Sequence, residues 1–302
     1  MIRVSVLTPT HNRSEKLKRL YLSLEKSTFR DFEWVIVNDG SSDDTESVVS
    51  ELIEKATFPV TYCYQENAGK HVAMNRLYDL AKGEYAFQID DDDELLFDAM
   101  EKGLAIWDGM EPSKREQCWC VCGRHTHYKT GKMLGDPFPS DINYLPLKKK
   151  KKVLASLKGD KCGMQKISLV RQFKFPEVKG CNFFPEIYLW RQLNSLYKQY
   201  YVNEFFGICH TQEGESLMNH SHDLKSYYQR YKIYEYLLSP NCSCRSSFFS
   251  RLHFVELYCF HKFADSSEIG SRERYVNISR SNRLMLVVMK IPYLLYKKIK
   301  NK

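Results

Sequence analysis

The sequence of 302 residues lacks the marks of several common protein classes. Met1 leads almost directly into the apolar segment Ile2–Leu7, without the charged region, apolar core and cleavage site of a signal peptide. A G-x-G-x-x-G fingerprint and a G-x-S-x-G elbow are both missing, which disfavours a nicotinamide or flavin Rossmann site and a serine nucleophile. We find no internal repeat and no long segment with the composition of a disordered chain.

The ten cysteines do not form the even framework of a disulfide-rich secreted domain. Cys118, Cys120 and Cys122, like Cys242 and Cys244, have C-x-C spacing rather than the C-x2-C of zinc knuckles. In the segment CWCVC the alternation places the three thiols on one strand face, where cysteine packs as a small hydrophobe. We therefore expect reduced, buried cysteines in a cytoplasmic protein.

The formal net charge of +8 favours an anionic partner, such as a nucleotide, an anionic glycan, a membrane surface or a nucleic acid. The run Lys148–Lys152 is typical of a solvated face or a helix start. The tail Leu284–Lys302 is too short and too interrupted to span a bilayer. It suits a helix lying at an anionic membrane surface, or a helix docked on its own domain, and both interpretations stay open.

The first hundred residues alternate between short apolar runs and amphipathic stretches, the βαβα pattern of a parallel sheet. Strands are predicted over Arg3–Leu7, Trp34–Val37, Val60–Tyr64 and Tyr85–Ile89. Helices are predicted over Ser14–Ser27, Asp43–Ala56, Gly69–Ala81 and Phe97–Met110. Right-handed crossovers give an α/β fold with an open, doubly wound, mainly parallel sheet, and ligands are expected beyond the carboxyl ends of the strands.

From about Gln117 the pattern changes. Cys118–Tyr128 alternates like a strand, and Phe184–Tyr200 has helical spacing. The last third is predicted to be mostly helical, including Asp223–Leu238 and Phe248–Phe263. We expect one domain over 1–215, with a nucleotide-sugar half over 1–110 and an acceptor half over 111–215, followed by a helical extension over 216–302.

Polar residues follow the second and third predicted strands. Asp39 comes just past a buried run, where its carboxylate can accept hydrogen bonds from a pyrimidine N–H or a ribose hydroxyl. An Asx turn leading into the next helix is the structural alternative. Lys70 and His71 open a helix that points at the same sheet edge, so they can meet a phosphate there, and Asn75 lies on the following turn.

The acid run Asp90–Glu94 comes directly after the apolar segment Tyr85–Ile89. Carboxylates crowded at the end of a buried strand repel one another unless a cation neutralises them. Oxygen-only ligands suit Mg²⁺ or Mn²⁺, either of which can bridge a diphosphate. The run therefore predicts a metal-and-phosphate site.

Four motifs in this order carry a resemblance: VSVLTPTHNR, VNDGSSDDT, NAGKHVAMN and GEYAFQIDDDDEL. Together they resemble the family-2 glycosyltransferases of the GT-A fold over residues 1–100. The resemblance implies that Pro9, Thr10 and Asn12 lie in the loop flanking the nucleotide. It also implies that Asp39 is the acid that binds uracil.

The same resemblance assigns the acid run to the DxD motif, with Asp90 and Asp92 at its outer positions. In that motif the second aspartate ligates the metal, which implies Asp92 as metal ligand with Asp90 nearby, and the neighbouring acids contact ribose and phosphate. Because the run has extra acids, the register is open by one residue, and Asp91 and Asp93 remain candidates.

Downstream segments are similar to the acceptor half of bacterial members of this family. They are GDKCGMQKISLVRQFKFPE, NFFPEIYLWRQL and YYVNEFFG. The resemblance implies that Glu186, at the start of a long helix, is the general base; a plain first-turn acid is the alternative. Asp160 is a weaker candidate for acceptor contact. His210 is a candidate for a place near the metal or diphosphate, with a packed or surface histidine as the alternative.

We therefore expect an inverting, metal-dependent transfer from a UDP-sugar to a glycan or lipid-linked saccharide at the cytoplasmic membrane face. A non-catalytic nucleotide-sugar binder of the same fold is one alternative. A nucleic-acid binder is another, but the basic residues form no recognisable reading module and the acid run would repel a phosphate backbone. We expect no nucleic-acid partner.

Overall fold

The computed structural model describes residues 2–177 and 182–210. The chain divides into two compact units, one made of Met1–Phe175 with Pro185–Glu213 and the other of Pro176–Phe184 with Gly214–Lys302. The predicted helices at Asp223–Leu238 and Phe248–Phe263, the tail Leu284–Lys302 and the extension 216–302 lie outside the described residues. The domain boundaries expected from the sequence stay a prediction.

The first unit is built on one eight-stranded sheet with the order β3-β2-β1-β4-β7-β6-β8-β5. Its strands are β1 Val4–Thr10, β2 Phe32–Asp39, β3 Val60–Gln65, β4 Tyr85–Gln88, β5 Glu94–Leu95, β6 Cys118–His127, β7 Gly163–Lys166 and β8 Lys198–Cys209. The pairs β1–β2, β2–β3, β1–β4 and β6–β8 are parallel. The pairs β4–β7, β6–β7 and β5–β8 are antiparallel. This confirms the predicted α/β class with a doubly wound, mainly parallel sheet.

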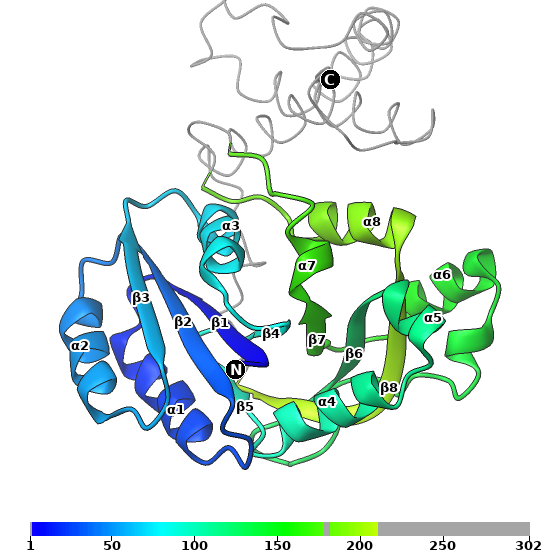
Figure 1. Cartoon of the computed structure of the whole chain (residues 1–302), viewed down its shortest axis with the longest axis horizontal. Helices are drawn as coiled ribbons and strands as arrows, with labels where there is room; N and C mark the ends of the chain where they lie inside the picture. The colour runs from blue at the N-terminus through cyan, green and yellow to red at the C-terminus, as the bar shows by residue number, and fades with distance from the viewer. Residues whose placement is uncertain (1, 178–181, 211–302) are drawn as a thin grey trace, which may run out of the picture. The chain divides into compact units, whose positions relative to one another are not determined.

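Helices flank the sheet (Figure 1). They are α1 Ser14–Glu25, α2 Thr45–Lys55, α3 Lys70–Leu80, α4 Ala99–Asp108, α5 Pro112–Glu116, α6 Leu147–Ser156, α7 Ile167–Val170 and α8 Ile187–Leu196, with a 3-10 turn at Ile142–Tyr144. Figure 1 shows α1 and α2 on one side of strands β1 to β3 and α3 on the other. Among the described residues no helix combines the length and apolar character that a bilayer crossing requires.

The apolar stripe of α1 explains how this helix is held. Leu17, Leu20 and Leu24 recur at helical spacing, and all three are fully buried. On the same face Tyr21 stacks on Trp34 of β2, with ring centroids 6.4 Å apart. The interior of β1 and β2 is buried along its whole length, as expected of parallel strands covered on both faces.

The sequence pattern missed three strands, β5, β7 and β8, and misplaced one helix end. It predicted one helix over Phe184–Tyr200, but α8 ends at Leu196 and residues from Lys198 onward belong to β8. Strand β8 pairs with β6, and β7 lies between β4 and β6. These pairings join segments far apart in the chain, so local periodicity carries little sign of them.

The cysteine prediction holds for the described part of the chain. Cys118, Cys120 and Cys122 on β6 are free thiols and all are buried. Burial raises the pKa of Cys118 to about 11 and that of Cys122 to about 12, so both stay protonated and behave as core residues. Cys242 and Cys244 lie outside the described residues.

Candidate active site

The acid run folds back on itself directly after β4. The backbone N–H of Asp93 donates to the carbonyl oxygen of Asp90 at 3.1 Å, which closes a tight turn. Because of this turn the four carboxylates point to different partners instead of lining one edge. The run therefore contacts three separate groups of side chains, around Lys70, Arg13 and His210.

Lys70 joins the first carboxylate of the run to the predicted base. Its ammonium, on the first residue of α3, lies 2.7 Å from Asp90 Oδ1 and 2.9 Å from Glu186 Oε1. Gln88, at the end of β4, donates to the same Glu186 oxygen at 3.1 Å. Burial alone would lower the pKa of Lys70, but the carboxylates of Asp90 and Glu186 outweigh it and raise that pKa. The lysine stays charged and holds both acids at the sheet edge.

Arg13 joins the second and third carboxylates. Its guanidinium lies 2.9 Å from Asp91 Oδ1 and 2.6 Å from Asp92 Oδ2. Lys16 approaches Asp92 at 3.8 Å, and the Arg19 guanidinium donates to the Asp92 backbone carbonyl. A basic cluster at the start of α1 thus neutralises the middle of the acid run.

Asp93 turns toward the last strand. Its Oδ1 accepts a hydrogen bond from the backbone N–H of His210 at 3.0 Å. The His210 ring lies with Nε2 2.6 Å from Glu94 Oε1 and stacks on Tyr128, with centroids 4.6 Å apart. The structure therefore places His210 beside the acid run, paired with Glu94.

Burial changes the acidity of two carboxyl groups in the run. It raises the pKa of Asp91 to about 6, although Arg13 opposes the shift, and it raises the pKa of Asp93 to about 7. For Asp90 burial acts in the same sense, but the Lys70 ammonium outweighs it and the pKa is lowered. Ionising Asp91 and Asp93 is thus unfavourable unless further positive charge is supplied.

This donor set fits a hard divalent cation. The run offers carboxylate oxygens, which Mg²⁺ and Mn²⁺ prefer, and the burial that raises the pKa of Asp91 and of Asp93 is a cost that added positive charge would reduce. Asp92 is half-buried, and Arg13 holds its carboxylate. A cation at Asp92 would compete with Arg13 for the same carboxylate.

Asp39 organises the loop that precedes α3. Its Oδ1 accepts hydrogen bonds from Gln65 Nε2 at 2.8 Å and from the Ala68 N–H at 2.9 Å. Its Oδ2 accepts from the Gly69 N–H at 2.8 Å. Beside it Gly40 has φ 73°, and a Cβ there would lie 2.6 Å from the Asn67 nitrogen, so only glycine fits. The Asp39 carboxylate therefore positions the start of α3, and with it Lys70.

We expect Asp39→Asn to destabilise the protein by about 1–3 kcal/mol, since the amide would turn an N–H₂ toward buried N–H donors that lose their acceptor. The matched control is Asp44→Asn, because Asp44 is exposed and makes no side-chain capping hydrogen bond. Urea unfolding followed by circular dichroism measures both changes. Equal midpoints for the two variants would contradict this structural role.

Asn12 connects the loop after β1 to the loop after β2. Its side-chain oxygen accepts from the Ser42 N–H at 2.7 Å, and its own N–H donates to the Ser41 hydroxyl at 2.9 Å. Asn12 has φ 54°, a conformation that asparagine tolerates better than most residues. Pro9 and Thr10 end β1 and are buried.

The structure describes two more of the predicted residues, Asn75 and Asp160. The Asn75 side chain is buried and brackets the backbone of Phe175, donating to its carbonyl at 2.9 Å and accepting from its N–H at 2.8 Å. The side chain thus holds the backbone of Phe175 in place, and its contact with the donor stays a prediction. Asp160 is exposed.

Three residues beside the site were not among the sequence candidates. Arg13 closes the motif TPTHNR and could have been found from its place next to the acid run's sheet edge. Gln88 precedes the acids by two positions, but its contact with Glu186 spans 98 residues. His125 lies on β6, and no local signal marks it.

Comparison with known proteins agrees with this geometry. The profile of "Glycosyl transferase family 2" matches residues 5–161, more than half of the chain. A GalNAc(5)-diNAcBac-PP-undecaprenol beta-1,3-glucosyltransferase from Campylobacter jejuni is 38% identical over 102 residues, 33% of each chain. A putative teichuronic acid biosynthesis glycosyltransferase from Bacillus subtilis is 32% identical over 102 residues, 33% of this chain and 40% of that one. The matches span about a third of the length of these curated relatives.

Solved structures share the fold. The S. aureus protein TarS in complex with UDP-GlcNAc has a TM-score of 0.55 at 18% identity, covering 87% of this chain and 73% of that chain. A mannosyltransferase from Pyrobaculum calidifontis in complex with GDP-Man and Mn²⁺ has a TM-score of 0.51 at 15% identity, covering 99% of this chain and 82% of that chain.

Proposed function

The chain belongs to glycosyl transferase family 2, and from this premise we propose that it is an inverting glycosyltransferase acting on a nucleotide-diphosphate sugar. The observation that carries the proposal is the contact of Lys70 with both Asp90 and Glu186. It brings the acid run, which suits a diphosphate-bound cation, next to a carboxylate that suits a general base. Neither group alone would define a transferase.

The donor is proposed to be a UDP-sugar. Asp39, Asn12 and the loop they hold lie at the carboxyl ends of β1 and β2, where a doubly wound sheet binds nucleotides. The complex of TarS with UDP-GlcNAc supports a uridine nucleotide. The complex of the archaeal mannosyltransferase with GDP-Man and Mn²⁺ supports a divalent cation on the donor.

Glu186 is proposed as the base. It lies at the N-terminal end of α8, half-buried, with one oxygen bonded to Lys70 and Gln88. These contacts fix the carboxylate in place, so that it can take the proton of an acceptor hydroxyl attacking the anomeric carbon. When bound, Mg²⁺ or Mn²⁺ on Asp92 with Asp90 nearby would stabilise negative charge on the leaving diphosphate.

The two lysine contacts give Lys70 a role in the same step. Its ammonium lies 2.9 Å from Glu186 Oε1, so a charged hydrogen-bond donor orients the carboxylate. Its second contact ties this charge to Asp90, on the donor side of the site. The lysine therefore positions the base relative to the diphosphate and is itself close enough to contact phosphate.

The acceptor is proposed to be a glycan hydroxyl carried on a lipid diphosphate. The relative from C. jejuni carries PP-undecaprenol in its name, and the B. subtilis relative is named for teichuronic acid biosynthesis. These names support a reaction in cell-surface polysaccharide synthesis, and we propose that it takes place at the cytoplasmic membrane face. Peripheral attachment through Leu284–Lys302 belongs to this proposal, although the tail lies outside the described residues.

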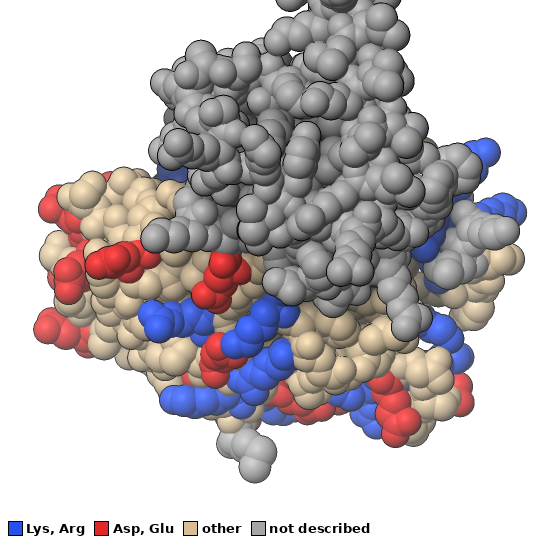
Figure 2. Space-filling model, turned by 90° about the horizontal axis from the view of Figure 1, so that it is seen from above, with Lys and Arg blue, Asp and Glu red and all other residues tan. Residues whose placement is uncertain are grey.

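Figure 2 bears on the nucleic-acid alternative. On the face that it draws, Lys and Arg lie among Asp and Glu over the described residues, rather than forming a continuous basic stripe. Backbone recognition of nucleic acid needs such a stripe. The described residues on this face therefore give no support to the nucleic-acid alternative.

A thermal-shift screen of UDP-, GDP- and TDP-sugars tests the donor. We expect a UDP-sugar with Mn²⁺ to stabilise the protein, by about 2.7 kcal/mol at a hundredfold excess over Kd, and EDTA to remove the effect. Positive donors then enter a transfer assay with a lipid-linked saccharide. Binding without transfer or donor hydrolysis across the panel would indicate a non-catalytic nucleotide-sugar binder, and no stabilisation by any sugar nucleotide would contradict the proposal.

A further inference from the structure

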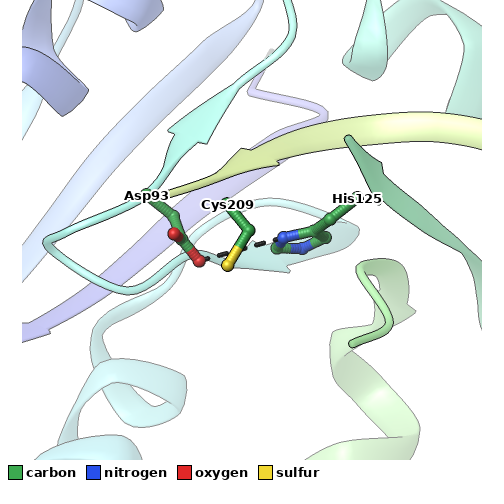
Figure 3. A group of neighbouring side chains, drawn as sticks. All are labelled: Asp93, His125 and Cys209. Carbon is green, nitrogen blue, oxygen red and sulfur yellow. Dashed lines mark ion pairs between the residues drawn. The ribbon is translucent and has the colours of Figure 1, made fainter. Parts of the chain in front are cut away.

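The last aspartate of the acid run and two side chains beside it converge on one point (Figure 3). Asp93, His125 and Cys209 each direct one ligand atom there, and these atoms all lie within 4.8 Å of one another. His125 and Cys209 are buried and Asp93 is half-buried. The group contains oxygen, nitrogen and sulfur, in contrast to the all-oxygen set of Asp90, Asp91 and Asp92.

The fold brings these residues together from three separate segments. His125 is on β6, Cys209 ends β8, and Asp93 closes the turn before β5. The parallel pairing of β6 with β8 sets His125 opposite Gly207. A Cβ on Gly207 would lie 3.3 Å from His125 Nε2, so glycine leaves room for the ring there. The rigid sheet therefore holds two of the three side chains in place.

His125 has an unsatisfied nitrogen inside this group. Its Nδ1 is buried and has no hydrogen-bond partner among the described residues. Asp93 Oδ2 lies 3.8 Å away, too far for a hydrogen bond. The imidazole is about nine-tenths buried, and an unpaired polar atom in such a place costs free energy that a bound ligand would recover. This nitrogen points toward the Asp93 carboxylate and the Cys209 sulfur.

The arrangement differs from a cysteine–histidine–aspartate relay. In a relay the aspartate and the nucleophile bond opposite nitrogens of the imidazole. Here the Cys209 thiol bonds the Asp93 carboxyl directly, and that carboxyl faces His125 Nδ1. Three ligand atoms around one centre are the pattern of a metal site.

We propose that Asp93, His125 and Cys209 form a second metal site that takes Zn²⁺, separate from the Mg²⁺ or Mn²⁺ site proposed on the donor. Thiolate and imidazole ligands prefer Zn²⁺, whereas Mg²⁺ and Mn²⁺ prefer oxygen. Binding would release the thiol proton of Cys209 and replace its bond to Asp93 by two metal–ligand bonds. Three protein ligands leave a fourth tetrahedral position for water.

Such a site would tie the acid run to the sheet. Asp93 is the last of the four consecutive aspartates, and its other oxygen already accepts from the His210 backbone. A zinc ion would fix this residue to β6 and β8, and so hold Asp90, Asp91 and Asp92 in register. Asp93 is the least buried ligand, so the ion would enter from its side. The inference concerns metal binding and holds whether or not the chain transfers sugars.

Cobalt substitution tests the site directly. The full chain is stripped with EDTA, dialysed and titrated with Co²⁺ and then Zn²⁺. We expect a sulfur-to-cobalt charge-transfer band in the near ultraviolet, tetrahedral d–d bands in the visible, and loss of both when one equivalent of Zn²⁺ displaces the cobalt. Wild-type protein that shows no thiolate band overturns the proposal by itself.

Variants identify the ligands. Cys209→Ser should lose the sulfur band. His125→Gln should lower the affinity for Zn²⁺ by a larger factor than the loss of a residue that only hydrogen-bonds a ligand, which costs about 10- to 100-fold. Cys209→Asp keeps an ionisable ligand, so it should hold Zn²⁺ without the sulfur band. Cys63→Ser, at a free thiol on β3, is the matched control. Unchanged bands in Cys209→Ser, or Zn²⁺ binding that is lost only in Asp92→Asn, would overturn the assignment.

Discussion

Glu186→Gln is expected to lower kcat for sugar transfer by about 10²- to 10⁴-fold, the usual contribution of a general base. Glutamine is nearly isosteric, and its amide oxygen can still accept from Lys70 and Gln88, so the fold and the donor site should persist. It cannot take the acceptor proton at neutral pH. A coupled assay of UDP release gives kcat, and calorimetry with the donor and Mn²⁺ shows whether donor affinity is kept.

The matched control is Glu101→Gln, an exposed acid on α4 that should transfer at the wild-type rate. A Glu186→Gln enzyme with full activity would reject Glu186 as the base. Loss of donor binding together with activity would instead indicate that Glu186 serves the donor site through Lys70. The split between kcat and donor affinity therefore separates a chemical role from a positioning role.

Asp92→Ala is expected to remove metal-dependent donor binding and to lower kcat/KM by about 10³-fold or more. A bound divalent cation contributes several kcal/mol of charge stabilisation on the leaving diphosphate, and about 1.4 kcal/mol corresponds to tenfold in rate. Calorimetry of UDP binding with and without Mn²⁺ measures the first effect, and steady-state kinetics the second.

Asp31→Ala, an exposed aspartate at the turn before β2, serves as the control and should keep the Mn²⁺ dependence. Alanine variants of Asp90 and Asp91 test the register of the motif, because the metal ligand is the position whose loss abolishes the Mn²⁺ effect. Mn²⁺-dependent UDP binding that survives in Asp92→Ala would move the assignment to one of its neighbours.

The four aspartates of the acid run have different partners, although they are identical residues in sequence. Arg13 forms ion pairs with Asp91 and Asp92, and Lys70 forms one with Asp90. The turn directs Asp93 to the end of β8, where it accepts a hydrogen bond from the His210 backbone. A cation that binds here would displace or share the Arg13 contact. The guanidinium would then be free to meet the donor diphosphate, which matches the general preference of arginine for phosphate.

Much of the first half of the fold was predictable from local pattern. The apolar face of α1, the buried strands β1 and β2 and the start of α3 follow from periodicity and from the residues that end each element. The positions of Asp39, Lys70 and the acid run at one sheet edge followed from parallel topology, because the carboxyl ends of parallel strands share an edge.

Other features were beyond the reach of local pattern. The hydrogen bonds from the Asn75 side chain to the Phe175 backbone join residues a hundred positions apart. No spacing rule distinguishes such a contact from a contact with a ligand. The end of α8 and the start of β8 depend on the pairing of β8 with β6. The helical spacing of Phe184–Tyr200 contains no sign of that pairing. Long-range pairing of this kind overrides local propensity.

The sequence by itself determined the family motifs, the order of strands and helices over the first hundred residues, and the presence of a strong negative charge at the end of β4. The tertiary structure alone decided which carboxylate meets which cation, that Lys70 joins Asp90 to Glu186, and that Asp93, His125 and Cys209 converge. The physical reason is that periodicity and turn chemistry act over a few residues, whereas these contacts depend on how distant strands pair in one sheet.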